Sequence, residues 1–329
     1  MRLFSLFRRK PAERFDALPV PSLPAEALTL VVDEFGFPRP DWAHFAAWLA
    51  QYPTAEHATH YAAANHLWLE AMRASLPGAH TITASARFLI LHPTELPERI
   101  GAYTALLEKL TSRLLLLLPG LASAPVGRMP VLLFGHHDAY HHYCAHYYPD
   151  YGEYGLSGGM FLATGTGHIA LPYHHYAAAE PVLAHELTHA MLRTRRLPRW
   201  LDEGLAVTFE QTCYPPRRRE TPFEQQAAHQ RLWTEDNIQR FWRGDAFFAA
   251  DEFQTRSYEL AQTLVAGLSH DREAFLKFAQ AADHRDAGEA AAQATFGFGL
   301  GQAMAAYLGQ AKWDVRRQSA PSLTHEAGP

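Results

Sequence analysis

The chain has 329 residues, of which 48% are hydrophobic, and its 29 basic and 34 acidic side chains give a net charge of −5. This length is enough for a sizeable core and predicts two domains or one unit of two lobes. The small acidic excess argues against nucleic-acid binding, which favours a basic face. The only cysteines, Cys144 and Cys213, cannot form a disulfide framework, and their small number fits a reducing compartment.

Neither the N-terminus nor the aliphatic runs predict a membrane span. The apolar stretch within residues 1–10 is too short for a signal peptide, and its main basic cluster follows it instead of preceding it. The longest aliphatic run, residues 114–118, is far shorter than the roughly 20 residues that a spanning helix needs. We therefore expect a soluble, cytoplasmic protein.

Residues 1–80 are predicted to form an N-terminal arm and a helical extension without evident chemistry. Several prolines within residues 11–40 indicate an irregular arm. Apolar residues then recur at helical spacing across residues 41–76, and Pro77-Gly78 ends this run.

Beyond residue 80, strand and helix patterns alternate. Short apolar runs at 88–91, 131–134 and 168–172 predict strands, and residues 96–118 predict a long helix. A His- and Tyr-rich segment after the second run is predicted to be helical, and glycines across 155–167 indicate loop and strand.

The chain after residue 177 is predicted to be helical throughout. The expected helices cover residues 178–195, 203–212, 224–243, 255–268, 271–283, 287–294 and 300–309. Strands followed by helices alone predict an α+β architecture, with a sheet lobe packed on a helical lobe and a site in the cleft between them. The predicted main domain is therefore 81–312, comprising 81–195 and 196–312, and a disordered tail is expected at 313–329.

A His-Glu-x-x-His sequence occupies residues 185–189. Residues four apart on a helix lie about 40° apart around its axis, so His185 and His189 project from one face and can share a metal ion. In this arrangement Glu186 flanks the metal and serves as general base for a water molecule. In a chain with 20 histidines a chance match is the competing interpretation. The surrounding apolar helix argues against it, because a polar set there is costly unless something satisfies it.

A zinc site needs a third protein ligand and an open fourth position. The metzincin pattern is excluded, because Leu192 and Arg195 stand where it requires glycine and histidine. The gluzincin pattern requires a glutamate on the following helix, and Glu203 supplies one in the segment Trp-Leu-Asp-Glu-Gly-Leu-Ala at 200–206. Pro198 allows the chain to turn back between the two helices. A solvated acid at a helix start is the competing interpretation of Glu203.

These two motifs, at 185–189 and 200–206, resemble the peptidase MA-like family of gluzincin zinc metallopeptidases and, more distantly, the M1-type aminopeptidases. The resemblance extends more loosely over roughly residues 85–310. It implies a thermolysin-like fold, in which a small sheet lies over the active-site helix and a helical lobe closes the zinc cleft. It also implies one Zn²⁺ per chain, held by His185, His189 and Glu203, and zinc-dependent hydrolysis of a peptide or protein substrate.

One departure from the family bears on specificity. M1-type aminopeptidases carry a Gly-x-Met-Glu-Asn segment, whose glutamate holds the free amine of the substrate. The nearest counterpart is Gly-Gly-Met-Phe at 158–161, with Phe161 where the acid would be. We therefore expect a peptidase that is not a strict aminopeptidase. The alternative is a catalytically inactive, metal-binding pseudo-peptidase that acts as a peptide-binding or regulatory module.

The resemblance also implies roles outside the metal ligands. Glu210 lies on nearly the same helix face as Glu203 and matches a glutamate that accepts a hydrogen bond from a ligand histidine, although it can equally be an exposed acid. Tyr258 matches a tyrosine whose hydroxyl points at the forming oxyanion, and its competing interpretation is packing between the lobes. The alternative donors are Tyr214, His229 and His270.

An extended substrate is expected to pair with a strand within residues 159–172, just before the metal helix. Backbone pairing of this kind gives affinity with little demand on sequence. Proline at Gly167 or Ile169 is expected to damage peptide binding more than alanine does.

Overall fold

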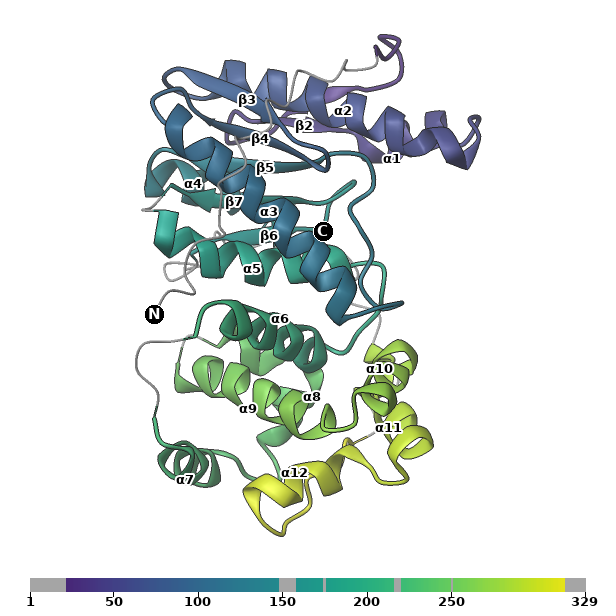
Figure 1. Cartoon of the computed structure of the whole chain (residues 1–329), viewed down its shortest axis with the longest axis vertical. Coiled ribbons are helices and arrows are strands. Elements are labelled where there is room, and N and C mark those ends of the chain that lie inside the picture. The colour runs from purple at the N-terminus through teal and green to yellow at the C-terminus, as the bar shows by residue number, and fades with distance from the viewer. Residues whose placement is uncertain (1–21, 148–157, 174–175, 216–219, 250, 317–329) are drawn as a thin grey trace, which may run out of the picture.

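The computed structural model describes residues 22–147, 158–173, 176–215, 220–249 and 251–316. A lobe built on a β-sheet and a lobe made of helices stack along the long axis of the molecule (Figure 1). The mixed α+β class is thus confirmed. In the described part of the chain, no helix is both long and apolar enough to cross a membrane.

The main sheet has five strands in the order β3-β4-β5-β7-β6. β4, β5 and β7 run parallel in its centre, and β3 and β6 pair antiparallel at its edges. The predicted apolar runs coincide with the three central strands, which are buried along their whole length. The strands are β3 (His80–Ala84), β4 (Phe88–Pro93), β5 (Met129–Phe134), β6 (Met160–Leu162) and β7 (His168–Pro172).

Helices cover both faces of this sheet. Side chains alternate between the two faces along each strand, so successive residues contact different helices. Leu89, Leu132 and Ala170 face α2 and α4, whereas Ile90 and Val131 face α3 and α5. The helices of this lobe are α2 (Thr54–Ser75), α3 (Pro97–Leu117), α4 (His137–Ala145) and α5 (Tyr176–Leu192).

The segment before the sheet contains more than helices. A two-stranded antiparallel ribbon, β1 (Leu30–Val32) and β2 (Pro38–Pro40), precedes α1 (Trp42–Leu49). The pattern of prolines concealed these short strands. Trp68 of α2 links this region to the ribbon, because its indole N–H donates to the carbonyl of Pro38 at 2.9 Å. α2 also packs on the main sheet through Trp68, Leu69 and Met72, whereas Phe45 and Leu49 of α1 pack with Ala64 of α2.

The second lobe is helical, as predicted after β7. Its elements are α6 (Arg199–Cys213), α7 (Pro222–Leu232), α8 (Ile238–Arg243), η1 (Asp245–Phe248), α9 (Glu252–Leu268), α10 (Arg272–Ala281), η2 (His284–Asp286), α11 (Glu289–Phe296) and α12 (Leu300–Leu308). The single helix expected over 224–243 is wrong, because α7 and α8 are separate. Asn237 and Thr234 accept each other's backbone N–H through their side chains, which ends one helix and starts the next.

The bounds of the two helices that carry the motif differ from those expected. α5 already begins at residue 176, so Pro181 lies inside it and not in its first turn. It ends at Leu192 instead of residue 195. α6 starts at Arg199, directly after Pro198, which places Glu203 in the second turn and not at a helix start. Glu203 is therefore buried at the contact between the lobes.

α6 and α9 cross closely at Gly204, next to Glu203. A Cβ atom at Gly204 would lie 2.8 Å from both the carbonyl oxygen of Ala261 and Cγ2 of Val265. Gly204→Ala is therefore expected to lower the free energy of unfolding by about 1–3 kcal/mol through overpacking. Chemical denaturation measures this change. Gly267→Ala is the matched control, because Gly267 lies on α9 with open space at its Cβ position. The control should be neutral or stabilising, and equal behaviour of the two variants would contradict the close crossing.

Candidate metal centre

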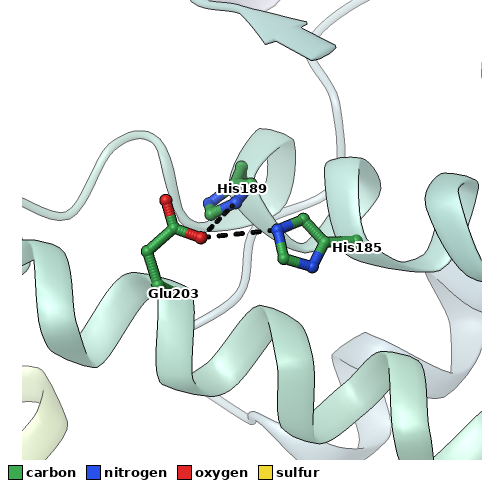
Figure 2. Close-up of side chains that lie close together, drawn as sticks. All are labelled: His185, His189 and Glu203. Atoms are coloured by element: carbon green, nitrogen blue, oxygen red, sulfur yellow. Dashed lines mark ion pairs between the residues drawn. The ribbon is translucent and has the colours of Figure 1, made fainter. Parts of the chain in front are cut away.

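The metal-ligand motif lies where the two lobes meet. α5 forms the lower edge of the sheet lobe in Figure 1, and α6 runs beneath it as the first helix of the helical lobe. His185 and His189 occupy successive turns of α5 and point towards α6. Glu203 points back at them from α6 (Figure 2). The local helix spacing thus aligns the histidines, and the turn at Pro198 brings the carboxylate opposite them.

A single oxygen of Glu203 faces both histidines. Its Oε2 atom lies 3.4 Å from Nε2 of His185 and 3.3 Å from Nε2 of His189 (Figure 2). The three potential ligand atoms all lie within 4.8 Å of one another. Within the described ranges of the chain, these three residues are the one group of three or more His, Cys, Asp or Glu side chains that could hold a metal ion.

The donor atoms fit a bound cation. The Glu203 side chain is only 7% exposed, and its Oε2 atom is buried without a hydrogen-bond partner. This oxygen has lost its water, and only the two imidazoles, at 3.3 and 3.4 Å, take the place of that water. A divalent cation between the carboxylate and the two imidazoles would satisfy it, and the mixed nitrogen and oxygen set is one that zinc accepts.

The electrostatics of the metal-free site are those of a carboxylate between two imidazolium groups. Burial lowers the pKa of His185, but Glu203 and Glu210 outweigh this effect and raise it to about 9. Burial likewise opposes charge on His189, yet Asp202 and Glu203 raise its pKa well above the usual value. The two histidines in turn hold the pKa of Glu203 far below its ordinary range, against the effect of burial. Metal binding would replace these protons.

The second ring nitrogen of each histidine meets a carboxylate. Nδ1 of His185 lies 3.1 Å from Oε2 of Glu210, and Nδ1 of His189 lies 2.9 Å from Oδ2 of Asp202. Such contacts orient a ligand imidazole and leave its Nε2 for the metal. Glu210 thus lies beside one of the two predicted ligand histidines. Asp202 was missed, and the available signal was its position immediately before Glu203.

Substituting Glu210→Gln or Asp202→Asn is expected to weaken zinc affinity by about 10–100-fold, because each change removes a charge that orients a ligand histidine. Competition with a chromogenic chelator measures the effect. Thr212→Ala is the control, since Thr212 is exposed on the same helix and its hydroxyl donates only to the carbonyl of Thr208. Affinities equal to that of the control would reject the orienting role.

Glu186 points towards the sheet. Its Oε2 atom accepts the backbone N–H of Phe161 on β6 at 2.7 Å. Burial raises the pKa of Glu186, although the nearby charges of His185 and His189 and the Phe161 N–H oppose the rise. A carboxylate that is held in place and whose pKa is raised is suited to accepting a proton near neutral pH.

Tyr258 lies against the site on α9. Its ring centroid is 6.2 Å from that of His185 in an edge-to-face arrangement, and Phe247 packs on it at 5.4 Å. Of the four candidates, only Tyr258 has a described ring contact with one of the predicted metal ligands. His229 is fully buried in α7, where it accepts the indole N–H of Trp233, and His270 is exposed beyond the end of α9. Tyr214 forms the C-cap of α6. Tyr258 therefore stays the predicted oxyanion donor.

The edge strand next to the site is β6. A substrate was expected to pair with a strand within residues 159–172, and the structure limits the choice to this strand. β7 pairs with β5 on one side and β6 on the other, so Ile169 is an interior position. Gly167 lies in the turn between β6 and β7 with φ +79°. Proline at either position would damage the sheet itself. Of the strands described within 159–172, β6 alone is an edge strand of the sheet, and its Phe161 N–H already donates to Glu186.

No family model matches the chain, and no curated protein matches it. Function is therefore inferred from the chemistry of the site. The most informative observation is that two imidazoles and one carboxylate oxygen lie close together. A second glutamate lies on the same helix as the histidines.

Proposed function

We propose that the chain is a zinc-dependent peptidase of the gluzincin type. The observation that carries the proposal is the buried Oε2 of Glu203, which lies 3.3–3.4 Å from Nε2 of both His185 and His189 and lacks a hydrogen-bond partner. Two imidazoles and one carboxylate are a ligand set of catalytic zinc sites, which keep a fourth position for water or substrate. The expected cofactor is one Zn²⁺ per chain.

The proposed chemistry divides between the metal and Glu186. Zinc bound by the triad would polarise the carbonyl of the scissile bond and lower the pKa of a water molecule. The Glu186 carboxylate would take the proton of that water and pass it to the leaving amine. The hydrogen bond from Phe161 to its Oε2 atom holds this carboxylate, so that its other oxygen can carry the proton.

The proposed substrate is a peptide or protein in extended conformation. Support comes from β6, an antiparallel edge strand that reaches Glu186 through its Phe161 N–H. A substrate backbone would pair along this edge beside that hydrogen bond and would not use the same N–H. An extended chain added to this edge would pass beside the metal ligands. The thermolysin-like fold is also part of this proposal. It rests on the contact between the edge strand β6 and the metal helix α5. Phe161 in place of an acid argues against a strict aminopeptidase.

Tyr258→Phe is expected to lower the turnover rate by on the order of 100-fold, as for the loss of one oxyanion donor. The tyrosine hydroxyl stays protonated at neutral pH and can donate a hydrogen bond to a developing negative charge. The variant removes only one oxygen, so its zinc content and peptide affinity should barely change. Steady-state kinetics measure the turnover rate, and metal analysis measures the zinc content. Near-normal turnover would reject this role of Tyr258.

The test of the proposed function is hydrolysis of a mixed peptide library by protein purified without chelators. Zinc content is measured first, then cleavage is followed by mass spectrometry before chelation, after chelation and after zinc is restored. Cleavage that disappears and returns with zinc supports the proposal. Stoichiometric zinc without cleavage would instead favour the metal-binding pseudo-peptidase.

A further inference from the structure

Arg199 stands beside the metal ligands but has no part in the chemistry above. It opens α6 one turn before Glu203, on the same helix face. Its Nη1 atom lies 3.4 Å from Oε1 of Glu203, the oxygen that does not face the histidines. The Arg199 side chain is 44% exposed. The guanidinium therefore meets solvent at the edge of the metal centre.

An exposed aromatic ring supports this guanidinium. The Cζ atom of Arg199 lies 5.1 Å from the ring centroid of Phe248, which ends η1 and is itself 65% exposed. The turn between α8 and η1 is shaped to receive the arginine. Gly244 has φ +93°, and a Cβ atom there would come 2.9 Å from Cβ of Arg199. Only glycine permits both this conformation and this approach.

This arrangement leaves the donor edge of the guanidinium usable. Arginine has five N–H donors in a planar fork, and stacking on Phe248 occupies a face and not that edge. The contact with Glu203 uses one donor, at a distance longer than the 2.7–2.9 Å of strong charge-assisted hydrogen bonds. Within the described residues, Glu203 is the one acid that Arg199 contacts. An incoming carboxylate would find a fork suited to bidentate binding.

The position relative to the metal ligands defines what Arg199 can reach. Arg199 and the histidines contact opposite oxygens of a single carboxylate. One carboxylate group thus separates the guanidinium from the two Nε2 atoms, so it would lie close to an ion held by the triad. A group bound by Arg199 would therefore belong to a residue next to, or one removed from, the scissile bond.

We propose that Arg199, seated on Phe248, is a specificity-determining residue that binds a carboxylate of the substrate close to the scissile bond. This inference rests on the proposed function, because it assumes that the site cleaves peptides. The carboxylate is either the C-terminal group of the peptide or the side chain of an acidic residue.

Peptide binding tests this proposal without turnover. Zinc-loaded Glu186→Gln protein is titrated with two series of matched peptides by fluorescence anisotropy. One series compares a free C-terminal carboxylate with its amide, and the other compares aspartate with asparagine near the centre of a peptide with blocked ends. We expect tighter binding of the acid by about 10- to 100-fold in one series, which identifies the source of the carboxylate.

Adding Arg199→Gln to this protein should reduce the preference for the acid to near unity, whereas Arg199→Lys should retain part of it. Arg240→Gln is the matched control, because Arg240 stacks on Phe253 at 4.7 Å in the same lobe. Zinc content is measured for every variant. The proposal is overturned if neither series shows a preference, if the preference survives Arg199→Gln, or if that variant loses zinc and weakens acid and amide binding equally.

Hydrolysis by the unsubstituted protein separates this inference from the proposed function. A preference for acids that depends on Arg199, in a protein without peptidase activity, would leave the binding site standing and refute hydrolysis. Cleavage of acid and amide peptides with equal kcat/KM would support hydrolysis and refute the role of Arg199.

Discussion

Alanine in place of His185, His189 or Glu203 is expected to reduce bound zinc from one ion per chain to well below stoichiometric. Each substitution removes one of three ligands that lie within 4.8 Å of one another, so two donors remain for an ion that prefers four. Metal analysis after gel filtration measures the loss. Peptide hydrolysis should disappear together with the metal.

Thermal unfolding gives an independent measurement of the same prediction. A ligand that binds only the folded state raises the melting temperature as its concentration increases. Zinc should therefore stabilise the parent protein and the control His270→Ala, whose imidazole is exposed beyond the end of α9. It should leave the three ligand variants nearly unchanged. A stoichiometric ion in any of these variants would show that the metal is held elsewhere.

Glu186→Gln is expected to lower kcat by about 100- to 10,000-fold, the usual range for the loss of a general acid–base group. The substituted amide keeps the shape of the side chain but cannot take a proton from water. Glutamine can still accept the Phe161 N–H through its amide oxygen, so β6 should stay in place. Zinc content and thermal stability should therefore match those of the parent protein.

Rate and metal content are measured on the same preparations, so that the loss of a base is distinguished from the loss of the metal. Glu180→Gln is the control, because it makes the same chemical change on the same helix outside the motif. Full activity of Glu186→Gln with zinc bound would refute the proposed mechanism. If the variant does not bind zinc, Glu186 is instead needed to keep the metal site intact.

The sequence by itself determined the features that depend on spacing within one element. His185, Glu186 and His189 share one helix, so the helical repeat alone sets which of them face the same direction. The central strands β4, β5 and β7 were also predictable, because strands covered on both faces are continuously apolar. Glu203 was found because the gluzincin pattern requires a glutamate on the helix that follows the two histidines, and Pro198 allows the chain to turn back between the two helices.

Only the tertiary structure decided which groups meet across elements. The contacts of Asp202 with His189, of Phe161 with Glu186 and of Phe248 with Arg199 join residues that no local repeat relates. The edge strand β6 is three residues long, too short for an alternating pattern to appear. Glu203 is acidic in any context, and it becomes a buried carboxylate that faces two imidazoles only because α5 packs on α6.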